Sequence, residues 1–500
     1  MCQSGLKVSI QLDGDFMTDL GFKFNTTYTQ LPKVFFKKCL PAPVSQPTLV
    51  LLNHELVAHL GLDFSSLSMG QTAQIFSGRM VPKGAEYFSQ AYAGHQFGYF
   101  TILGDGRAHI WGEHSVPGDR TVDIAFKGSG LTPYSRGGDG FATLEAMLRE
   151  YLVSEAMHHL GISTTRSLAL VVTGQNIERQ TTLPGAILTR VASSHIRVGT
   201  FEFAYVQNDL NALTELLDYT VKRHYPSLQA SKNKPLELIR AFMERQIDLV
   251  VHWMRVGFVH GVMNTDNMCL SGETIDYGPC AFMDEFRKDV AFSYIDQAGR
   301  YAYANQPIIA KWNIARFSEA LTPLIDSDEN KANDKVNAIL KTFDQMYDQK
   351  WTDMMKCKLG LLGHMAGDRQ LIHDLLFWME SNDADFTNTF LALTELRHPS
   401  EDVYQCDGFK NWYDQWTYRL SINEQPIEMA RSMMKESNPL IIPRNHQVQK
   451  VLSEVSRGDF DGFDALMNQL KTPYKGQPGI EQYQVPPKPH ERILNTFCGT

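Results

Sequence analysis

The sequence predicts an α+β protein of two lobes, with a β-rich first part and a larger helical second part. Short apolar runs bounded by turn residues, typical of strands, occur at 99–103, 108–111, 122–126, 167–172 and 186–190. Apolar residues recur at helical spacing at 141–160 and then, beyond about residue 205, at 235–258, 336–360 and 370–395. Because the strands come first and most of the long helices later, we expect two packed lobes.

The same pattern divides the chain into three segments. We expect an N-lobe at 1–205, a helical C-lobe at 206–472 and an extended tail at 473–500. Five prolines between 473 and 489 favour an extended path over the surface for the tail. The acidic run at 326–330 is expected to be a solvated loop.

Composition excludes several classes of protein. The 500 residues include 47 Lys and Arg against 56 Asp and Glu, and the net charge of −9 argues against a general nucleic-acid binder. No segment approaches the roughly 20 apolar residues that span a bilayer, and the first residues lack the apolar core of a secretory signal. Seven scattered cysteines indicate a reducing compartment. We therefore expect a cytoplasmic enzyme whose partners include neither nucleic acid nor a membrane.

The turn between the strands at 99–103 and 108–111 is rich in glycine and is predicted to join them as a hairpin. Gly104 and Gly106 let the backbone approach a phosphate closely, and Arg107 adds positive charge. Taken alone, a turn with two glycines is in most cases a plain hairpin.

A lysine and a glutamate downstream extend the pattern. Lys127 ends the apolar strand at 122–126, where it points into a cleft or, alternatively, into solvent. Glu150 follows 23 residues later in the helix at 141–160, and its alternative is a single charge on a polar helix face. Protein kinases hold a strand lysine with a helix glutamate after a glycine-rich hairpin, so the order of these features favours a phosphate-binding site.

The segment 260–278 contains a second part of the same pattern. Asn267 stands seven residues after His260, and a hydrophobic-Asp-aromatic-Gly run that includes Asp276 follows, as in the kinase signature. Asn and Asp oxygens suit Mg²⁺, which shares its coordination sphere with phosphates. The combination predicts a nucleotide and metal site.

One position departs from the kinase pattern. The kinase general base stands two residues after the histidine, where this chain has Val262, and valine cannot accept a proton. Asp266 is the predicted substitute because it adjoins the metal-type Asn267. Its alternative role is a turn residue that caps its own loop.

Four further residues are candidates for the same pocket. Arg190 closes a strand and Arg197 follows seven residues later, so the two can complete an anion site, although single arginines usually form surface ion pairs. Asp139 and Gly140 lie in a glycine-rich loop that can fold over a nucleotide or remain a flexible surface turn.

The sequence resembles the selenoprotein O family of kinase-fold proteins. The resemblance is carried by long strings at 92–98, 127–136, 193–199, 263–284, 438–446 and 497–500. It implies a protein-kinase-like two-lobed fold whose activity is protein adenylylation. ATP binds in reverse orientation, AMP passes to Ser, Thr or Tyr hydroxyls of a protein, and pyrophosphate leaves. UMP transfer from UTP is also attributed to the family.

The resemblance implies a role for each candidate residue. The residues that contact the nucleotide are Gly104, Gly106, Arg107, Lys127, Asp139, Gly140, Glu150, Arg190, Arg197 and Asp276. Within this set Glu150 orients Lys127. Asp266 is the proton acceptor, and Asn267 and Asp276 bind Mg²⁺ or Mn²⁺.

The family also uses redox control through a cysteine near the C-terminus. Cys498 is the corresponding residue here, and Cys269 or Cys280 is its candidate disulfide partner. Both follow motifs of the predicted site, so a tail that folds back brings Cys498 close to either.

Two alternatives to nucleotidyl transfer remain on the same fold. One is a phosphotransferase in the style of the aminoglycoside kinases, and the other is a non-catalytic pseudokinase that acts as a nucleotide-binding scaffold. Val262 at the base position argues against the first. Intact Asn267 and Asp276 argue against the second.

Overall fold

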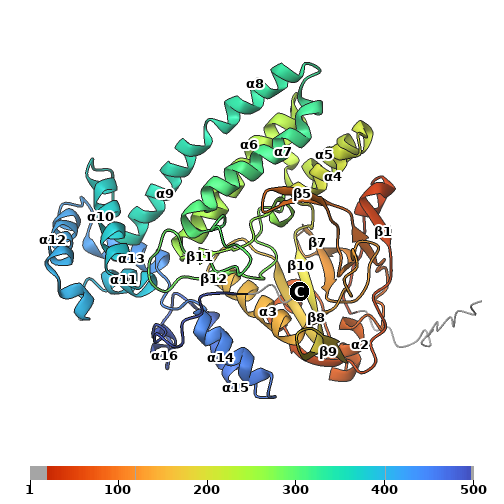
Figure 1. Cartoon of the computed structure of the whole chain (residues 1–500), viewed down its shortest axis with the longest axis horizontal. Coiled ribbons are helices and arrows are strands. Elements are labelled where there is room, and N and C mark those ends of the chain that lie inside the picture. The colour runs from red at the N-terminus through yellow and green to blue at the C-terminus, as the bar shows by residue number, and fades with distance from the viewer. Residues whose placement is uncertain (1–19, 119, 400, 497–500) are drawn as a thin grey trace, which may run out of the picture.

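The first part of the chain forms one large antiparallel sheet. The computed structural model describes residues 20–118, 120–399 and 401–496 (Figure 1). The strands of this sheet are β1 (Phe36–Lys38), β2 (Thr48–Leu52), β3 (Phe88–Gln90), β6 (Ala108–Val116), β7 (Arg120–Lys127), β8 (Ala142–Thr143), β9 (Arg166–Glu178) and β10 (Thr182–Ala192). They follow the order β1-β3-β6-β7-β10-β9-β2, with β8 paired to β10. The strands predicted from 108 to 190 are therefore confirmed.

Helices cover the sheet on both faces, which explains why its strands read as continuous apolar runs. On β7, Ala125 packs in the core beneath α3 (Leu144–His159). Its neighbours Ile124 and Phe126 pack on the other face with α1 (His54–His59) and α2 (Met69–Phe76). Successive side chains of a strand point to opposite faces, so Lys127 emerges on the same face as Ala125, under α3.

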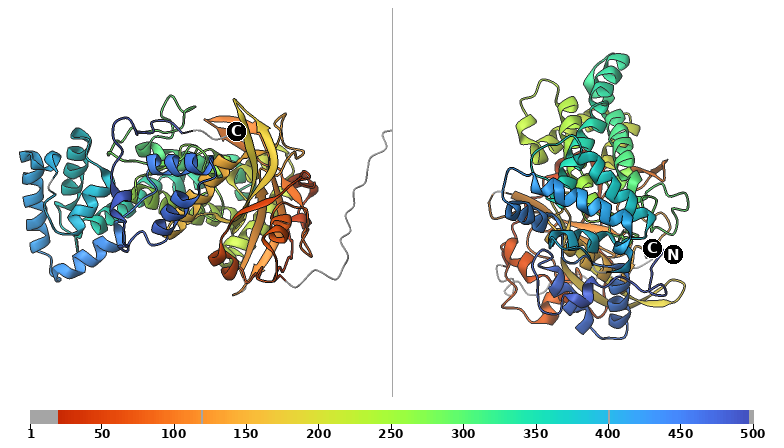
Figure 2. Two further views of the ribbon diagram at one scale, coloured as in Figure 1. Left: turned by 90° about the horizontal axis from the view of Figure 1, so that it is seen from below. Right: turned by 90° about the vertical axis from the view of Figure 1, so that its left-hand side faces the viewer.

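The chain after residue 206 is mostly helical. Its helices, with α4 just before, are α4 (Val198–Val206), α5 (Leu210–His224), α6 (Lys234–Arg255), α7 (Gln306–Ile325), α8 (Glu329–Leu340), α9 (Phe343–Leu359), α10 (Asp368–Ser381), α11 (Phe386–Thr394), α12 (Asp407–Ser421), α13 (Ile427–Ser437), α14 (Asn445–Val455), α15 (Asp461–Leu470) and α16 (Glu481–Gln484). Helices α6 and α7 pack against each other, and α10 and α12 lie at the end of the molecule away from the sheet (Figure 2). Among the described residues no helix has the length and apolar character needed to cross a membrane. The predicted combination of a sheet and many helices is confirmed.

Three helix boundaries differ from the predictions. The segments 336–360 and 370–395 each contain a break, because α8 gives way to α9 and α10 gives way to α11. Asp385 caps α11 by accepting a bond from the backbone N–H of Asn388 at 2.8 Å. The loop predicted at 326–330 is wrong in its second half, because Asp328 caps α8 and the helix begins at the next residue.

The hairpin predicted from 99–103 to 108–111 is wrong. Strand β5 (Tyr99–Ile102) pairs with β4 (Ala93–Gln96), whereas β6 pairs with β3 and β7. The β4–β5 turn consists of Phe97 and Gly98, whose φ angles of 52° and 90° suit a tight two-residue turn. The Gly104–Gly106 segment thus connects this small hairpin to the large sheet.

Two short strands frame the segment that carries the kinase-like motifs. Strand β11 (Phe258–Val259) pairs with β12 (Ala281–Phe282), so the residues between them form a loop closed at its base. Thr496 packs beside the second strand: its hydroxyl donates to the Pro279 carbonyl at 2.6 Å, and its N–H donates to the Phe292 carbonyl at 2.6 Å. A segment distant in sequence therefore supports this loop.

Candidate functional site

The predicted site residues meet around one cavity of about 720 Å³. Its walls come from the β5–β6 connection, the end of β7, helix α3, strand β10 and the loop between β11 and β12. The predicted residues that line it are Gly104, Gly106, Arg107, Lys127, Asp139, Gly140, Glu150, Arg190, Arg197, Asp266, Asn267 and Asp276. Residues spread over more than 170 positions are thus brought into one place.

Sheet register explains the centre of this site. Lys127 on β7 lies opposite Leu188 of β10, and Arg190 lies two residues further along β10, so both side chains project toward α3. Glu150 on α3 meets them. The Lys127 Nζ donates to Glu150 Oε2 at 2.5 Å and to Asp276 Oδ1 at 2.5 Å. Arg190 bonds both the Glu150 carboxylate and Asp276 Oδ1, the latter at 2.6 Å.

Asp276 lies among three cationic side chains. Burial raises its pKa, but the charges of Arg190, Lys127 and Arg197 outweigh burial and hold the pKa well below its ordinary value. Its backbone has a φ of 63°, a left-handed conformation that is uncommon outside glycine. Such a conformation persists only where surrounding contacts impose it, and these ion pairs supply those contacts.

Asp266 has the opposite environment. It lies in a short turn, Thr265–Asn267, is buried, and its Oδ1 has no hydrogen-bond partner among the described residues. Burial raises the pKa of Asp266 to about 6, although Arg197 opposes this shift. A carboxylate with a free oxygen and such a pKa can accept a proton near neutral pH.

The surroundings of Asp266 leave little space on one side. A Cβ added to Gly94 of β4 would lie 2.3 Å from Asp266 Oδ1, so a glycine is needed at this contact. On the other side, the Asn267 side-chain N–H donates to the Val262 carbonyl at 2.9 Å. The amide orientation of Asn267 is therefore fixed, while Val262 itself lines the cavity and takes no part in proton transfer.

Arg197 connects the two aspartates. Its Nη1 donates to the Asp266 carbonyl at 3.0 Å and lies 3.6 Å from Asp276 Oδ2. Its guanidinium stacks over the Tyr92 ring at 4.4 Å and lies 3.8 Å from the buried Asp105 carboxylate. These contacts hold the Arg197 guanidinium between Asp266 and Asp276.

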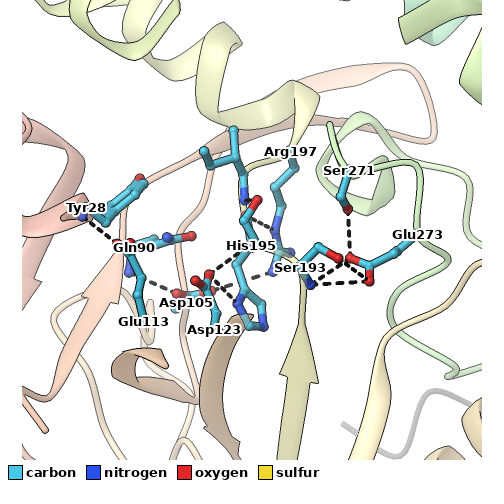
Figure 3. A network of polar contacts seen from close by, with 12 residues as sticks. Tyr28, Gln90, Asp105, Glu113, Asp123, Ser193, His195, Arg197, Ser271 and Glu273 are labelled. Carbon is cyan, nitrogen blue, oxygen red and sulfur yellow. Dashed lines mark hydrogen bonds and ion pairs between the residues drawn. The ribbon is translucent and has the colours of Figure 1, made fainter. Parts of the chain in front are cut away.

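The residues behind Arg197 form a buried polar network (Figure 3). The His195 backbone N–H and Nδ1 contact Asp123 Oδ2 at 2.9 and 3.0 Å. Arg223 donates to Asp123 Oδ1 at 2.6 Å, and Arg223 and His195 lower the pKa of Asp123 against the effect of burial. The network anchors the 193–197 segment, which places Arg197 at the cavity wall.

A family model described as Protein adenylyltransferase SelO matches residues 19–471. The chain belongs to the SelO family. It is 51% identical over 483 residues to the protein nucleotidyltransferase YdiU of Nitrosococcus oceani, a match that covers 96% of this chain and 98% of that protein. The YdiU proteins of Alcanivorax borkumensis and Geobacillus kaustophilus are each 50% identical over 96% of this chain, and over 99% and 100% of their own lengths.

The structure of this SelO family member adds cavity residues that the sequence patterns did not single out. Arg179, from the β9–β10 turn, donates to Asp139 Oδ2 at 2.7 Å and so lowers the pKa of Asp139. Arg149 precedes Glu150 on α3 and donates to the Cys280 carbonyl at 2.7 Å. Both are arginines close in the sequence to predicted elements, which is the one signal that could have identified them. Their contacts with Asp139 and with the Cys280 carbonyl depend on the tertiary fold.

The cysteine prediction is only partly within the described residues. Cys269 and Cys280 are both buried, and burial raises the pKa of the Cys269 thiol to about 12. Cys498 lies outside the described residues. A disulfide between Cys498 and either of them stays a prediction.

Proposed function

We propose that this chain transfers AMP from ATP, with UTP as an alternative donor of UMP, to Ser, Thr or Tyr hydroxyls of proteins. One observation carries the proposal: Asp266, whose pKa burial raises to about 6, lines the same cavity as Lys127, Arg190 and Arg197. A proton acceptor beside a cluster of cations suits attack of a hydroxyl on a phosphorus centre. Membership of the SelO family supports protein as the acceptor.

Cations and backbone amides are assigned to the polyphosphate. Lys127 and Arg190 share the Glu150 carboxylate, which fixes both heads in the cavity. The Gly104–Gly106 segment and Arg107 line the same wall. Fixed positive groups stabilise the charge that develops as pyrophosphate leaves, because they need no rearrangement during the reaction.

The donor set fits a divalent cation. Asp276 stays ionised, and the Asn267 amide nitrogen is engaged with Val262, which leaves its oxygen to act as a ligand. One carboxylate and one amide, completed by phosphate oxygens and water, match the ligands that Mg²⁺ takes at phosphate sites. Bound there, Mg²⁺ or Mn²⁺ would neutralise phosphate charge and polarise the phosphoryl group.

Asp266 is assigned the proton transfer. Its carboxylate accepts the proton of the acceptor hydroxyl while the hydroxyl oxygen forms a bond to the α-phosphorus. The bond from that phosphorus to the β-phosphate oxygen breaks, and the electrons leave with pyrophosphate. This step requires ATP to present its α-phosphate to Asp266, as the reversed orientation implies.

We further assign the chain a protein-kinase-like two-lobed fold, with lobes at 1–205 and 206–472, and a cytoplasmic location. The Lys127–Glu150 ion pair between a sheet strand and the helix that covers it supports the fold assignment. The charge balance and cysteine content support the location.

Two preparations of ATP, each labelled at one phosphate, test the proposal. The full chain is incubated with Mg²⁺ or Mn²⁺ and ATP labelled at either the α- or the γ-phosphate, with β-casein as an unfolded acceptor. Protein-bound label from the α-position alone is expected. Transfer from the γ-position alone indicates a phosphotransferase, and tight ATP binding without either transfer indicates a scaffold.

A further inference from the structure

The outer edge of β5 is open. Antiparallel pairs alternate between hydrogen-bonded and non-bonded, and the Leu103 N–H donates to the Tyr92 carbonyl at 2.9 Å. Leu103 and Tyr92 therefore form a hydrogen-bonded pair, and by alternation Thr101 and Gly94 form the next one. The pairs between them and beyond, Ile102 with Ala93 and Phe100 with His95, are not hydrogen-bonded. The backbone N–H and C=O groups of Phe100 and Ile102 therefore point away from β4. In the part of the chain that the structure describes, no strand pairs with this edge.

The side chains of this edge are apolar and exposed. Tyr99 is 80% exposed, Phe100 42% and Ile102 54%. Exposed edge strands are normally protected by charge, proline or a covering segment, and β5 has neither charge nor proline. An unprotected apolar edge is a template for an added strand.

The other strand of the hairpin, β4, contacts the part of the β11–β12 loop that carries Asp266. Besides the contact between Gly94 and Asp266, the His95 N–H donates to the Thr265 hydroxyl at 2.7 Å. The Phe97 N–H donates to Asn264 Oδ1 at 3.1 Å. The open edge of β5 is therefore one strand away from the strand that touches Asp266.

The spacing between neighbouring strands determines how far a bound segment lies from Asp266. A strand added to β5 would lie about 10 Å from β4, because neighbouring strands are about 4.8 Å apart. At about 3.3 Å per residue, a few residues of extended chain cover that distance. Tyr92, just before β4, and Gln96, the last residue of β4, line the cavity between this edge and Asp266.

We propose that the outer edge of β5 binds an extended segment of the protein substrate as an additional strand. Backbone hydrogen bonds to Phe100 and Ile102 hold the segment, and apolar side chains at alternate positions pack on the exposed residues of β5. A hydroxyl a few residues away then reaches Asp266. Target segments are therefore unfolded or loop regions with alternating apolar residues beside Ser, Thr or Tyr. The proposal rests on the proposed function, since it names how that same site selects its acceptor.

Two variants of β5 test the docking edge. Ile102→Pro removes an outward N–H without removing a bond to β4, and Phe100→Lys places a charge on the edge. For each, the KM for β-casein is expected to rise about tenfold, because Ile102→Pro loses one hydrogen bond to the segment and Phe100→Lys places a charge against its apolar side chains. The Kd of ATP measured without acceptor should stay unchanged. Tyr418→Lys, an exposed aromatic on α12 that is 68% exposed, is the matched control and should change neither quantity.

Amide hydrogen exchange provides a second measurement that needs no catalysis. Addition of β-casein to the wild-type chain should slow exchange at Phe100 and Ile102. Unchanged exchange together with an unchanged KM overturns the proposal, as does slow exchange at these amides before casein is added. A dimer that Ile102→Pro dissociates, measured by light scattering, assigns the edge to a second copy instead. If wild-type protein transfers no α-label to casein, the proposed function fails, and the exchange data still decide the docking proposal.

Discussion

Asp266 and Asp276 stand ten residues apart and line the same cavity, yet their environments are opposite. Asp276 lies among three cations that hold its pKa well below the ordinary value. Asp266 is buried with an unpaired oxygen, and its pKa is raised to about 6. The same carboxyl group becomes a fixed negative charge or a proton acceptor according to whether cations or apolar burial dominate around it.

Removal of Asp276 is expected to have the largest effect. Asp276→Ala deletes a metal ligand and leaves Lys127, Arg190 and Arg197 without their shared partner, so transfer of α-label should fall by about 10⁴-fold or more. Circular dichroism of the purified variant controls for folding. Activity above a tenth of the wild-type value in a folded variant rejects the assignment of Asp276.

Replacement of Asp266 is expected to have the second largest effect and to change the pH dependence. Asp266→Asn should lower kcat by about 10²- to 10⁴-fold, the range for a lost general base. In the wild type, the carboxyl accepts a proton only when ionised, so kcat/KM should fall about tenfold per pH unit below about pH 6, the pKa that burial gives to Asp266. The variant should lack this acidic limb. If the wild type and the variant show the same fall in kcat/KM below pH 6, that fall belongs to another titrating group.

Glu150 provides the smallest of the three effects. Glu150→Gln keeps the shape but removes one of the two carboxylates that hold Lys127 and Arg190, while Asp276 remains. We expect kcat/KM to fall about 10- to 100-fold, as for other residues that orient a ligand group. Glu155→Gln on the same helix is the control, since Glu155 pairs with Arg166 away from the cavity and should leave kcat/KM unchanged.

The sequence predicted the centre of the site because its motifs come from regular elements. Lys127 and Glu150 belong to a strand and a helix whose apolar periodicity is strong, so their positions followed from residue spacing. The predicted strands at 167–172 and 186–190 also lie within β9 and β10. The order of the strands in the sheet did not follow from the spacing of apolar residues, because strand pairing depends on contacts between residues that are distant in the sequence.

The hairpin error has a physical origin. Gly104 and Gly106 form a strong turn signal between two apolar runs, but the Phe97-Gly98 turn forms a shorter connection with both φ angles positive. A non-glycine residue in that conformation is difficult to predict from sequence. The environment of Asp266 was equally hidden, since it depends on Gly94, which lies far away in the chain.

The bond between Thr496 and Pro279 joins two segments that are synthesised at different times. These residues are 217 positions apart, and the Thr496 hydroxyl supports the loop that carries Asp276. At about 5–20 residues per second, translation reaches Thr496 roughly 10–45 s after Pro279 has been made. The large sheet can assemble during this interval, but the loop that carries Asp276 lacks this supporting contact until Thr496 has been made. A nascent chain that has not yet reached Thr496 lacks the bond that holds Pro279 beside β12.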